Sequence, residues 1–263
     1  MELEVISRQP SGTARPTPLL FVHGMWHGAW IWEEHFFPYF VERGYAVHAL
    51  SLRGHGNSEG SKNIRWHRIG SYVQDVAQVA STLDTPPVII GHSMGGYVTQ
   101  KYLENHPAAA GVLLASAPPG HGVWQATFRA LAKHPLAVLR VNLTFSMRPL
   151  VATPERYRWV FFTPDFPEDT LRRYHAQINN ESIVAFLGLL GLSRLHPRRV
   201  KVPMLVTGAE QDTLFSTAEI EGTARAYGTS AEIFPNVGHN MMLDTGWQAV
   251  GERIASWLDE QEL

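Results

Sequence analysis

The chain has 263 residues, 44% hydrophobic and 17% charged, so it is long enough for one substantial core and has neither a disordered nor a fibrous composition. A net charge of −2 argues against binding to nucleic acid, and the absence of cysteine excludes disulfides, thiolate catalysis and thiolate-bound metals. The acidic N-terminus and the lack of an apolar run of about 18 residues predict a cytoplasmic protein without a signal peptide or membrane span.

Short apolar runs alternate along the chain with segments of helical periodicity. This pattern predicts an α/β fold, with a mostly parallel central sheet and helices on both of its faces. The predicted strands are residues 18–22, 46–50, 88–90, 111–115, 204–207 and 232–234, with an opening edge strand near 3–7. The predicted helices are residues 32–42, 71–83, 94–105, 216–227 and 247–260, and Ser216 with Glu219 has the spacing of a capping box.

One segment breaks this alternation, because residues 118–197 contain no convincing strand. A structureless loop of that length is improbable in a compact domain, and helical patterns at 170–179 and 181–192 predict a mostly helical insertion. We therefore expect a core of residues 1–117 and 198–263, and a helical cap of residues 118–197.

The cap carries nine Lys or Arg against five Asp or Glu. Three of its basic residues could either steer an anionic substrate toward the site or belong to a solvated face. They are Arg148, Arg156 and Arg158. Its apolar residues either pack the cap on the core or line an apolar pocket. They are Trp124, Phe128, Phe145, Met147, Trp159, Phe161, Phe162, Phe186, Leu187 and Leu190.

The strongest chemical signal is Gly91-His92-Ser93-Met94-Gly95, between an apolar strand and a helix. A serine on such a tight strand-to-helix turn projects its hydroxyl out of the sheet, and the flanking glycines let the backbone crowd together. The helix N-terminus supplies unpaired N–H groups near the reacting oxygen. Ser93 is therefore the predicted nucleophile.

A nucleophilic serine needs a base, and the base needs an acid to orient it. Of thirteen histidines, His239 follows the last predicted strand, where it can reach over the carboxyl ends of the strands. Asp212 is the preferred acid, because it follows the strand at 204–207. Glu210 lies in the same loop and is its rival.

Acyl transfer also needs hydrogen-bond donors for the developing oxyanion. The residue after the nucleophile, Met94, offers its backbone N–H. A second donor is expected from the loop after the strand at 18–22, and Met25 N–H is the preferred choice.

At this point the chain resembles the α/β-hydrolase superfamily over essentially its whole length. Its first loop is similar to the H-G-x-x-x-G-x-W loop of small esterases, plant-type methylesterases and hydroxynitrile lyases. The resemblance implies carboxylic-ester hydrolysis without a cofactor, oxyanion donors at Met25 and Met94, and a cap over the pocket. The acid lies four residues after Gly208, where many members have three. The matching segments are His23-Gly24-Met25-Trp26-His27-Gly28-Ala29-Trp30, Arg53-Gly54-His55-Gly56-Asn57-Ser58, Gly91-His92-Ser93-Met94-Gly95-Gly96, Asp212 and Gly238-His239.

Other polar residues near these motifs are expected to be structural. His23 and His27 are four residues apart but lie on a glycine-containing loop, without a third metal ligand nearby. Arg53 and His55 are interpreted as hydrogen-bonding struts of the loop after the strand at 46–50.

The sequence thus predicts a serine esterase that works through an acyl-enzyme. The same three residues also serve lactone or carbon–carbon bond hydrolysis, perhydrolysis and hydroxynitrile cleavage in other proteins. The similar lyases need an additional lysine, for which none of the four here (62, 101, 133 and 201) is an evident candidate. A small-molecule receptor with vestigial activity is a further alternative.

Overall fold

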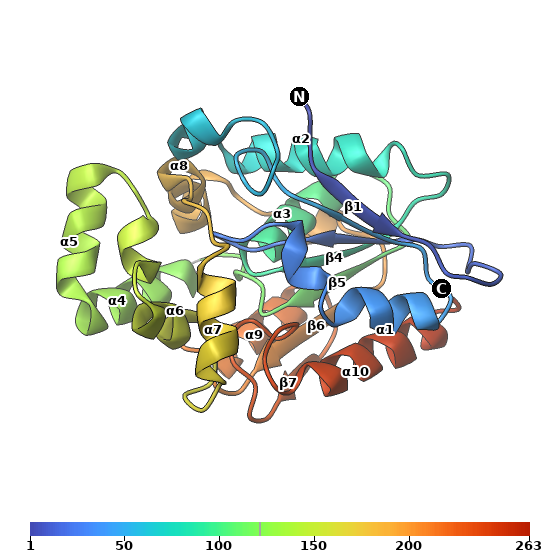
Figure 1. The fold of residues 1–263 in the computed structure, drawn as a ribbon. Coiled ribbons are helices and arrows are strands. Elements are labelled where there is room, and N and C mark those ends of the chain that lie inside the picture. The colour runs from blue at the N-terminus through green and yellow to red at the C-terminus, as the bar shows by residue number, and fades with distance from the viewer. Residues whose placement is uncertain (121) are drawn as a thin grey trace.

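A seven-stranded, mostly parallel sheet forms the centre of the molecule, as the alternating pattern predicts (Figure 1). The computed structural model describes residues 1–120 and 122–263. The strand order is β1-β3-β2-β4-β5-β6-β7, with β1 antiparallel to β3 at one edge and the other pairs parallel. The strands are β1 (Val5–Arg8), β2 (Leu19–Val22), β3 (Val47–Leu50), β4 (Val88–His92), β5 (Ala110–Leu114), β6 (Met204–Ala209) and β7 (Ala231–Phe234).

The central strands β2, β4, β5 and β6 are buried along their whole length, which explains why they are apolar on both faces. Helices α2 and α3 cover one face of the sheet, and α1 and α10 cover the other (Figure 1). Because parallel strands end at the same edge, the loops after β2, β4 and β6 meet there. The core helices are α1 (Phe36–Glu42), α2 (Ile69–Ala80), α3 (Met94–Leu103), α9 (Thr217–Ala226) and α10 (Trp247–Glu260).

The predicted helix over residues 32–42 is divided in the structure. A 3₁₀ turn covers Ala29–Trp32, and α1 begins only at Phe36. Pro38 explains the late start, because it lacks an N–H and is tolerated only in the first turn of a helix. The helix predicted over residues 247–260 and the Ser216–Glu219 capping box are both confirmed.

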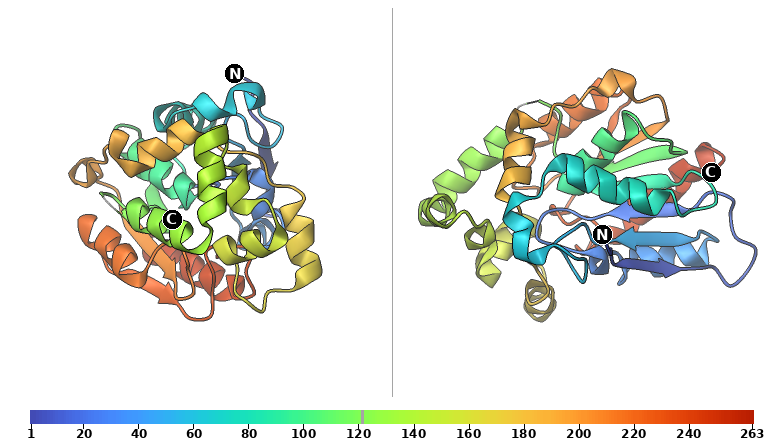
Figure 2. Two further views of the ribbon diagram at one scale, coloured as in Figure 1. Left: turned by 90° about the vertical axis from the view of Figure 1, so that its left-hand side faces the viewer. Right: turned by 90° about the horizontal axis from the view of Figure 1, so that it is seen from above.

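Five α-helices lie between β5 and β6, beyond the carboxyl edge of the sheet (Figures 1 and 2). The predicted helix at 170–179 is present as α7, and that at 181–192 as α8 followed by a π-type turn over Gly188–Leu192. The other three were not predicted individually. The helices are α4 (Gly122–Lys133), α5 (Pro135–Thr144), α6 (Pro154–Phe161), α7 (Glu168–His175) and α8 (Ile183–Leu187). The division into core and cap stays a prediction.

Across residues 1–120 and 122–263, no helix combines the length and apolarity needed to cross a membrane.

Candidate active site

Ser93 lies at the tip of the turn between β4 and α3, in a conformation that few residues with a side chain adopt. Its φ is 54° and its ψ is −119°. Such a backbone costs about 1–3 kcal/mol and persists only where the surroundings fix it. Glycines make the turn possible, because a Cβ on Gly95 would collide with the carbonyl oxygen of His23, and one on Gly91 with Thr99.

His239 and Asp212 are brought together from the loops after β7 and β6. Nδ1 of His239 donates to Oδ2 of Asp212 over 2.7 Å, and both side chains are fully buried. The second oxygen of Asp212 accepts from the backbone N–H groups of Leu214 (2.7 Å) and Phe215 (3.1 Å). These bonds fix the carboxylate toward the imidazole.

The rival acid, Glu210, is placed elsewhere. Its side chain is exposed, and its carboxylate accepts from the backbone N–H of Asn236 at 3.3 Å. Of the two acids in this loop, Asp212 is therefore the one that contacts His239.

The second ring nitrogen of His239, Nε2, is buried and has no hydrogen-bond partner in the part of the chain that the structure describes. The imidazole centroid is 4.8 Å from that of His92, the residue before Ser93, and 5.6 Å from the ring of Phe215. Ser93 and Phe215 line one cavity. Because Nδ1 donates to Asp212, Nε2 is the free basic nitrogen beside the serine turn.

The two predicted oxyanion donors also belong to this cavity, since Met25 and Met94 line it together with Ser93. Met94 is the first residue of α3, where a backbone N–H has no partner within the helix. Among residues 1–120 and 122–263, neither N–H has a backbone acceptor outside the regular elements. Both are thus available to an oxygen bound in the cavity.

The histidines of the first loop brace the backbone, as predicted. His23 donates from Nδ1 to the carbonyl of Gly24 and accepts from the backbone N–H of Leu52 at 3.0 Å. His27 donates to the carbonyl of Met25 at 2.7 Å and accepts from the Tyr157 hydroxyl at 2.9 Å. Burial lowers the pKa of His27 to about 3, so this ring is neutral and its hydrogen-bond pattern is fixed.

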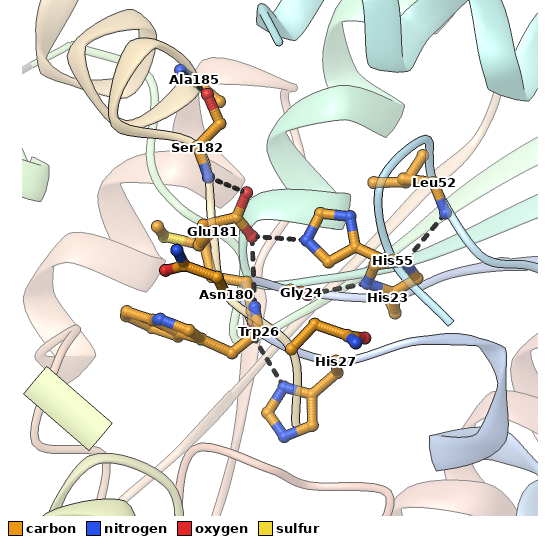
Figure 3. Close-up of polar contacts among 12 residues, drawn as sticks. His23, Gly24, Trp26, His27, Leu52, His55, Asn180, Glu181, Ser182 and Ala185 are labelled. Carbon is orange, nitrogen blue, oxygen red and sulfur yellow. Dashed lines mark hydrogen bonds and ion pairs between the residues drawn. The ribbon is translucent and has the colours of Figure 1, made fainter. Parts of the chain in front are cut away.

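A buried carboxylate that could not be identified from the sequence supports the same loop (Figure 3). Glu181 is completely buried, and its Oε2 accepts from the backbone N–H of Trp26 at 3.1 Å and from His55 at 3.0 Å. Its Oε1 accepts from the Tyr72 hydroxyl and from the N–H of Ser182. Trp26 follows the predicted donor Met25 and has a φ of 66°, so Glu181 holds a strained part of the loop after β2.

Burial lowers the pKa of His55, but the charge and hydrogen bond of Glu181 outweigh burial and raise it overall. The prediction that Arg53 and His55 are struts is confirmed, because Arg53 also forms a bidentate pair with Asp75. These two contacts connect the loop after β3 to α2 and to the segment before α8.

We expect Glu181→Gln to lower kcat for a short ester by about tenfold with little change in KM, and to destabilise the fold by about 3 kcal/mol. Each oxygen of Glu181 accepts from two donors, and the NH₂ group of glutamine cannot accept, so the two donors that face it lose their acceptor. Steady-state kinetics and denaturant unfolding measure the two effects. Glu168→Gln, at a half-exposed ion pair of α7, is the matched control. An unchanged kcat alongside lower stability would show that Glu181 does not position the oxyanion loop.

The three cap arginines proposed to steer an anionic substrate have partners within the cap. Arg148 donates to the carbonyls of Ile178 and Asn179, and Arg156 to that of Pro149. Arg158 pairs with Glu168 at 2.6 Å. None of the three lines the cavity, so their observed contacts are structural.

The cavity at Ser93 has a volume of about 250 Å³ and is almost entirely apolar. Apart from Ser93, only Thr127 and Asn142 contribute polar side chains among the described lining residues. Of the cap residues predicted to pack or to line a pocket, Trp124, Phe128 and Phe145 are instead exposed. Those that line the cavity are Met147, Phe186, Leu187 and Leu190.

Sequence analysis also missed the inner faces of α4 and α5. Val123, Ala126, Thr127 and Ala130 of α4 line the cavity at the i, i+3, i+4, i+7 spacing of one helix face. That spacing is visible in the sequence and could have identified them.

The model of the alpha/beta hydrolase family matches residues 19–253. A non-heme haloperoxidase from Rhodococcus erythropolis is 34% identical over 106 residues, which is 39% of this chain and 38% of that relative. This chain therefore aligns with less than half of that relative.

Two solved structures resemble this chain over nearly all of its length. A putative non-heme bromoperoxidase from Mycobacterium tuberculosis has a TM-score of 0.79 at 18% identity, covering 99% of this chain and 97% of its own. A thermophilic esterase from Thermogutta terrifontis has a TM-score of 0.73 at 19% identity, covering 99% and 95%. At these identities the likeness shows the fold.

Proposed function

The chain belongs to the alpha/beta hydrolase family, and we propose that within this family it hydrolyses apolar carboxylic esters through an acyl-enzyme on Ser93. The observation that carries this proposal is the environment of the two ring nitrogens of His239. Its Nδ1 is 2.7 Å from Asp212, and its Nε2 is buried and has no hydrogen-bond partner among residues 1–120 and 122–263. That arrangement supports the role of His239 as the base, because its ring lies 4.8 Å from the ring of His92, the residue before the strained Ser93.

In the proposed reaction, the hydroxyl oxygen of Ser93 attacks the ester carbonyl carbon while Nε2 of His239 takes the hydroxyl proton. The oxyanion accepts hydrogen bonds from the N–H groups of Met25 and Met94. Asp212 stabilises the imidazolium, which gives its proton to the leaving alcohol. Water, deprotonated by His239, then attacks the acyl-enzyme and releases the acid and free Ser93.

The apolar walls of the cavity favour an uncharged, apolar group on the substrate. We expect kcat/KM for nitrophenyl esters to rise with acyl length until the cavity is filled and then to fall. An acyl chain ending in a carboxylate is expected to react at least about tenfold more slowly, because its charge would be desolvated without a partner. Steady-state kinetics on a chain-length series measures both effects.

The variant Ala130→Phe narrows the cavity and is expected to slow only the longer esters. Equal rates for the carboxylate-ended and neutral chains would show that the acyl group does not occupy this cavity. No hydrolysis of any ester in the series would contradict the proposed function itself.

Perhydrolysis is a second candidate, favoured by the similarity to the haloperoxidase from Rhodococcus erythropolis. In that reaction hydrogen peroxide takes the place of water and attacks the carbonyl carbon of the acyl-enzyme. The acyl group is transferred to the peroxide oxygen, which gives a peracid. His239 carries the proton released by the peroxide to the oxygen of Ser93. Peracid formation from acetate and peroxide distinguishes this activity. No lysine lines the described part of the cavity, so nothing there favours hydroxynitrile cleavage.

A further inference from the structure

Exposed apolar side chains gather on the helices that cover the cavity. Most of the large hydrophobic residues that are exposed belong to residues 124–192, and they come mainly from α4 and α5. Soluble monomers seldom expose a contiguous apolar surface of this kind without a partner for it. We call these residues the outer cap face: Trp124, Phe128, Leu131, Leu136, Leu139, Leu143 and Phe145, with Leu187 and Leu192 beside them.

The exposed residues form a stripe on each helix. On α4 the positions 124, 128 and 131 are four and three apart, and on α5 the positions 136, 139 and 143 are three and four apart. Residues at these spacings share one helix face. Figure 2 (left) looks onto this end of the molecule, where both helices lie at the surface, farthest from the sheet. Leu136 and Leu143 are 70% and 71% exposed.

The charged side chains that α4 and α5 carry all have one sign. The sequence contains no Asp or Glu between Glu104 and Glu155, while α4 and α5 carry Arg129, Lys133 and Arg140. Arg129 pairs with Glu219, whereas Lys133 and Arg140 are exposed and form no ion pair within residues 1–120 and 122–263. The partner of this face should therefore be both apolar and anionic.

Two residues of the cavity wall lie at the same surface as the outer cap face. The opposite faces of α4 and α5 line the cavity, and two cavity-lining residues, Asn142 and Leu187, are themselves exposed. Asn142 adjoins Leu143 of the stripe on α5. An apolar chain held at this surface could enter the cavity without crossing water.

We propose that the outer cap face binds the surface of an anionic phospholipid membrane. Leucine and aromatic side chains enter the headgroup–acyl boundary, and the exposed Arg140, next to Leu139 of the stripe on α5, contacts anionic headgroups, as in helices that lie in a membrane interface. A second copy of the chain fits less well. A symmetric contact would place the same basic helices against each other with no acid from either.

Vesicle sedimentation in the Ser93→Ala background tests this binding without hydrolysis of the lipid. The protein is expected to sediment with phosphatidylcholine vesicles that contain about 30% phosphatidylglycerol, and less with pure phosphatidylcholine. The double substitution Leu136→Glu and Leu143→Glu is expected to lower the partition coefficient at least about tenfold. Trp66→Glu, at a residue 62% exposed outside the cap, is the matched control and should bind normally.

A second variant, Arg140→Gln, is expected to weaken sedimentation with anionic vesicles and to reduce its dependence on salt. The proposal is overturned if the protein stays in the supernatant with both vesicles, or if the leucine variant binds as well as Trp66→Glu. It is also overturned if sedimentation equilibrium shows a dimer that the leucine substitutions dissociate. None of these measurements depends on catalytic turnover. A failure of membrane binding would therefore not contradict the proposed ester hydrolysis, which is tested separately.

Discussion

Ser93→Ala is expected to lower kcat for a short nitrophenyl ester by on the order of 10⁴-fold or more. The substitution removes the only atom that could carry the acyl group in the proposed reaction, while His239 and the oxyanion donors remain in place. Activity is measured at saturating substrate, where dilute contaminating esterases contribute least. The exposed Ser256→Ala serves as the control and should keep full activity.

The fold of Ser93→Ala should be retained, because no hydrogen bond of the turn within residues 1–120 and 122–263 uses the hydroxyl. The backbone of Ser93 makes those bonds, through its N–H to Leu114 and its carbonyl to the N–H of Ala117. A variant that is folded by circular dichroism yet keeps more than a few per cent of the activity would eliminate Ser93 as the nucleophile.

Asp212→Asn is expected to lower kcat by about 10⁴-fold with a small change in KM. The amide of asparagine can donate to Nδ1 of His239, which would then leave the proton on Nε2 and remove the base that faces the serine turn. Initial rates of ester hydrolysis, measured over a range of substrate concentrations, give kcat and KM.

The neighbouring acid provides a close control for this experiment. Glu210→Gln is expected to change kcat by less than about twofold, because the Glu210 side chain is exposed and, within the described residues, its carboxylate accepts one hydrogen bond, from the backbone N–H of Asn236. If the two substitutions had equal effects, or if Glu210→Gln had the larger one, Asp212 would not be the acid that orients His239.

The site residues differ in how far sequence alone could identify them. Ser93 could be predicted because an apolar strand, two glycines and a helix coincide within a few residues. The acid could be narrowed only to Glu210 and Asp212, since the path of the loop after β6 decides between them. The bonds from Leu214 and Phe215 to Asp212 turn this carboxylate toward His239.

Glu181 could not be predicted, because its partners come from distant parts of the chain. Trp26 and Tyr72 are 155 and 109 residues away, and the sequence pattern shows only a residue at the start of an expected cap helix. Long-range contacts of this kind depend on how the cap packs against the core. The local periodicity of the sequence contains no information about that packing.

The helices α4 and α5 were missed for a different reason. Their inner residues line the cavity and their outer residues are exposed but equally apolar. On α5, apolar residues lie on two sides of the helix, so the 3.6-residue periodicity that marks an amphipathic helix is weak there. On α4 the spacing of the cavity-lining residues is present in the sequence, but the largest apolar side chains of that helix are the exposed ones of the outer cap face.

The most direct test of the central proposal is mass spectrometry of the intact protein after reaction with a fluorophosphonate. We expect wild-type protein to gain one phosphonyl group, mapped by peptide analysis to Ser93, and Ser93→Ala to gain none. Asp212→Asn should react at least about a hundredfold more slowly, because the serine then lacks an oriented base. Labelling at a different residue, or equal labelling of Ser93→Ala, would contradict the assignment of Ser93 as the nucleophile.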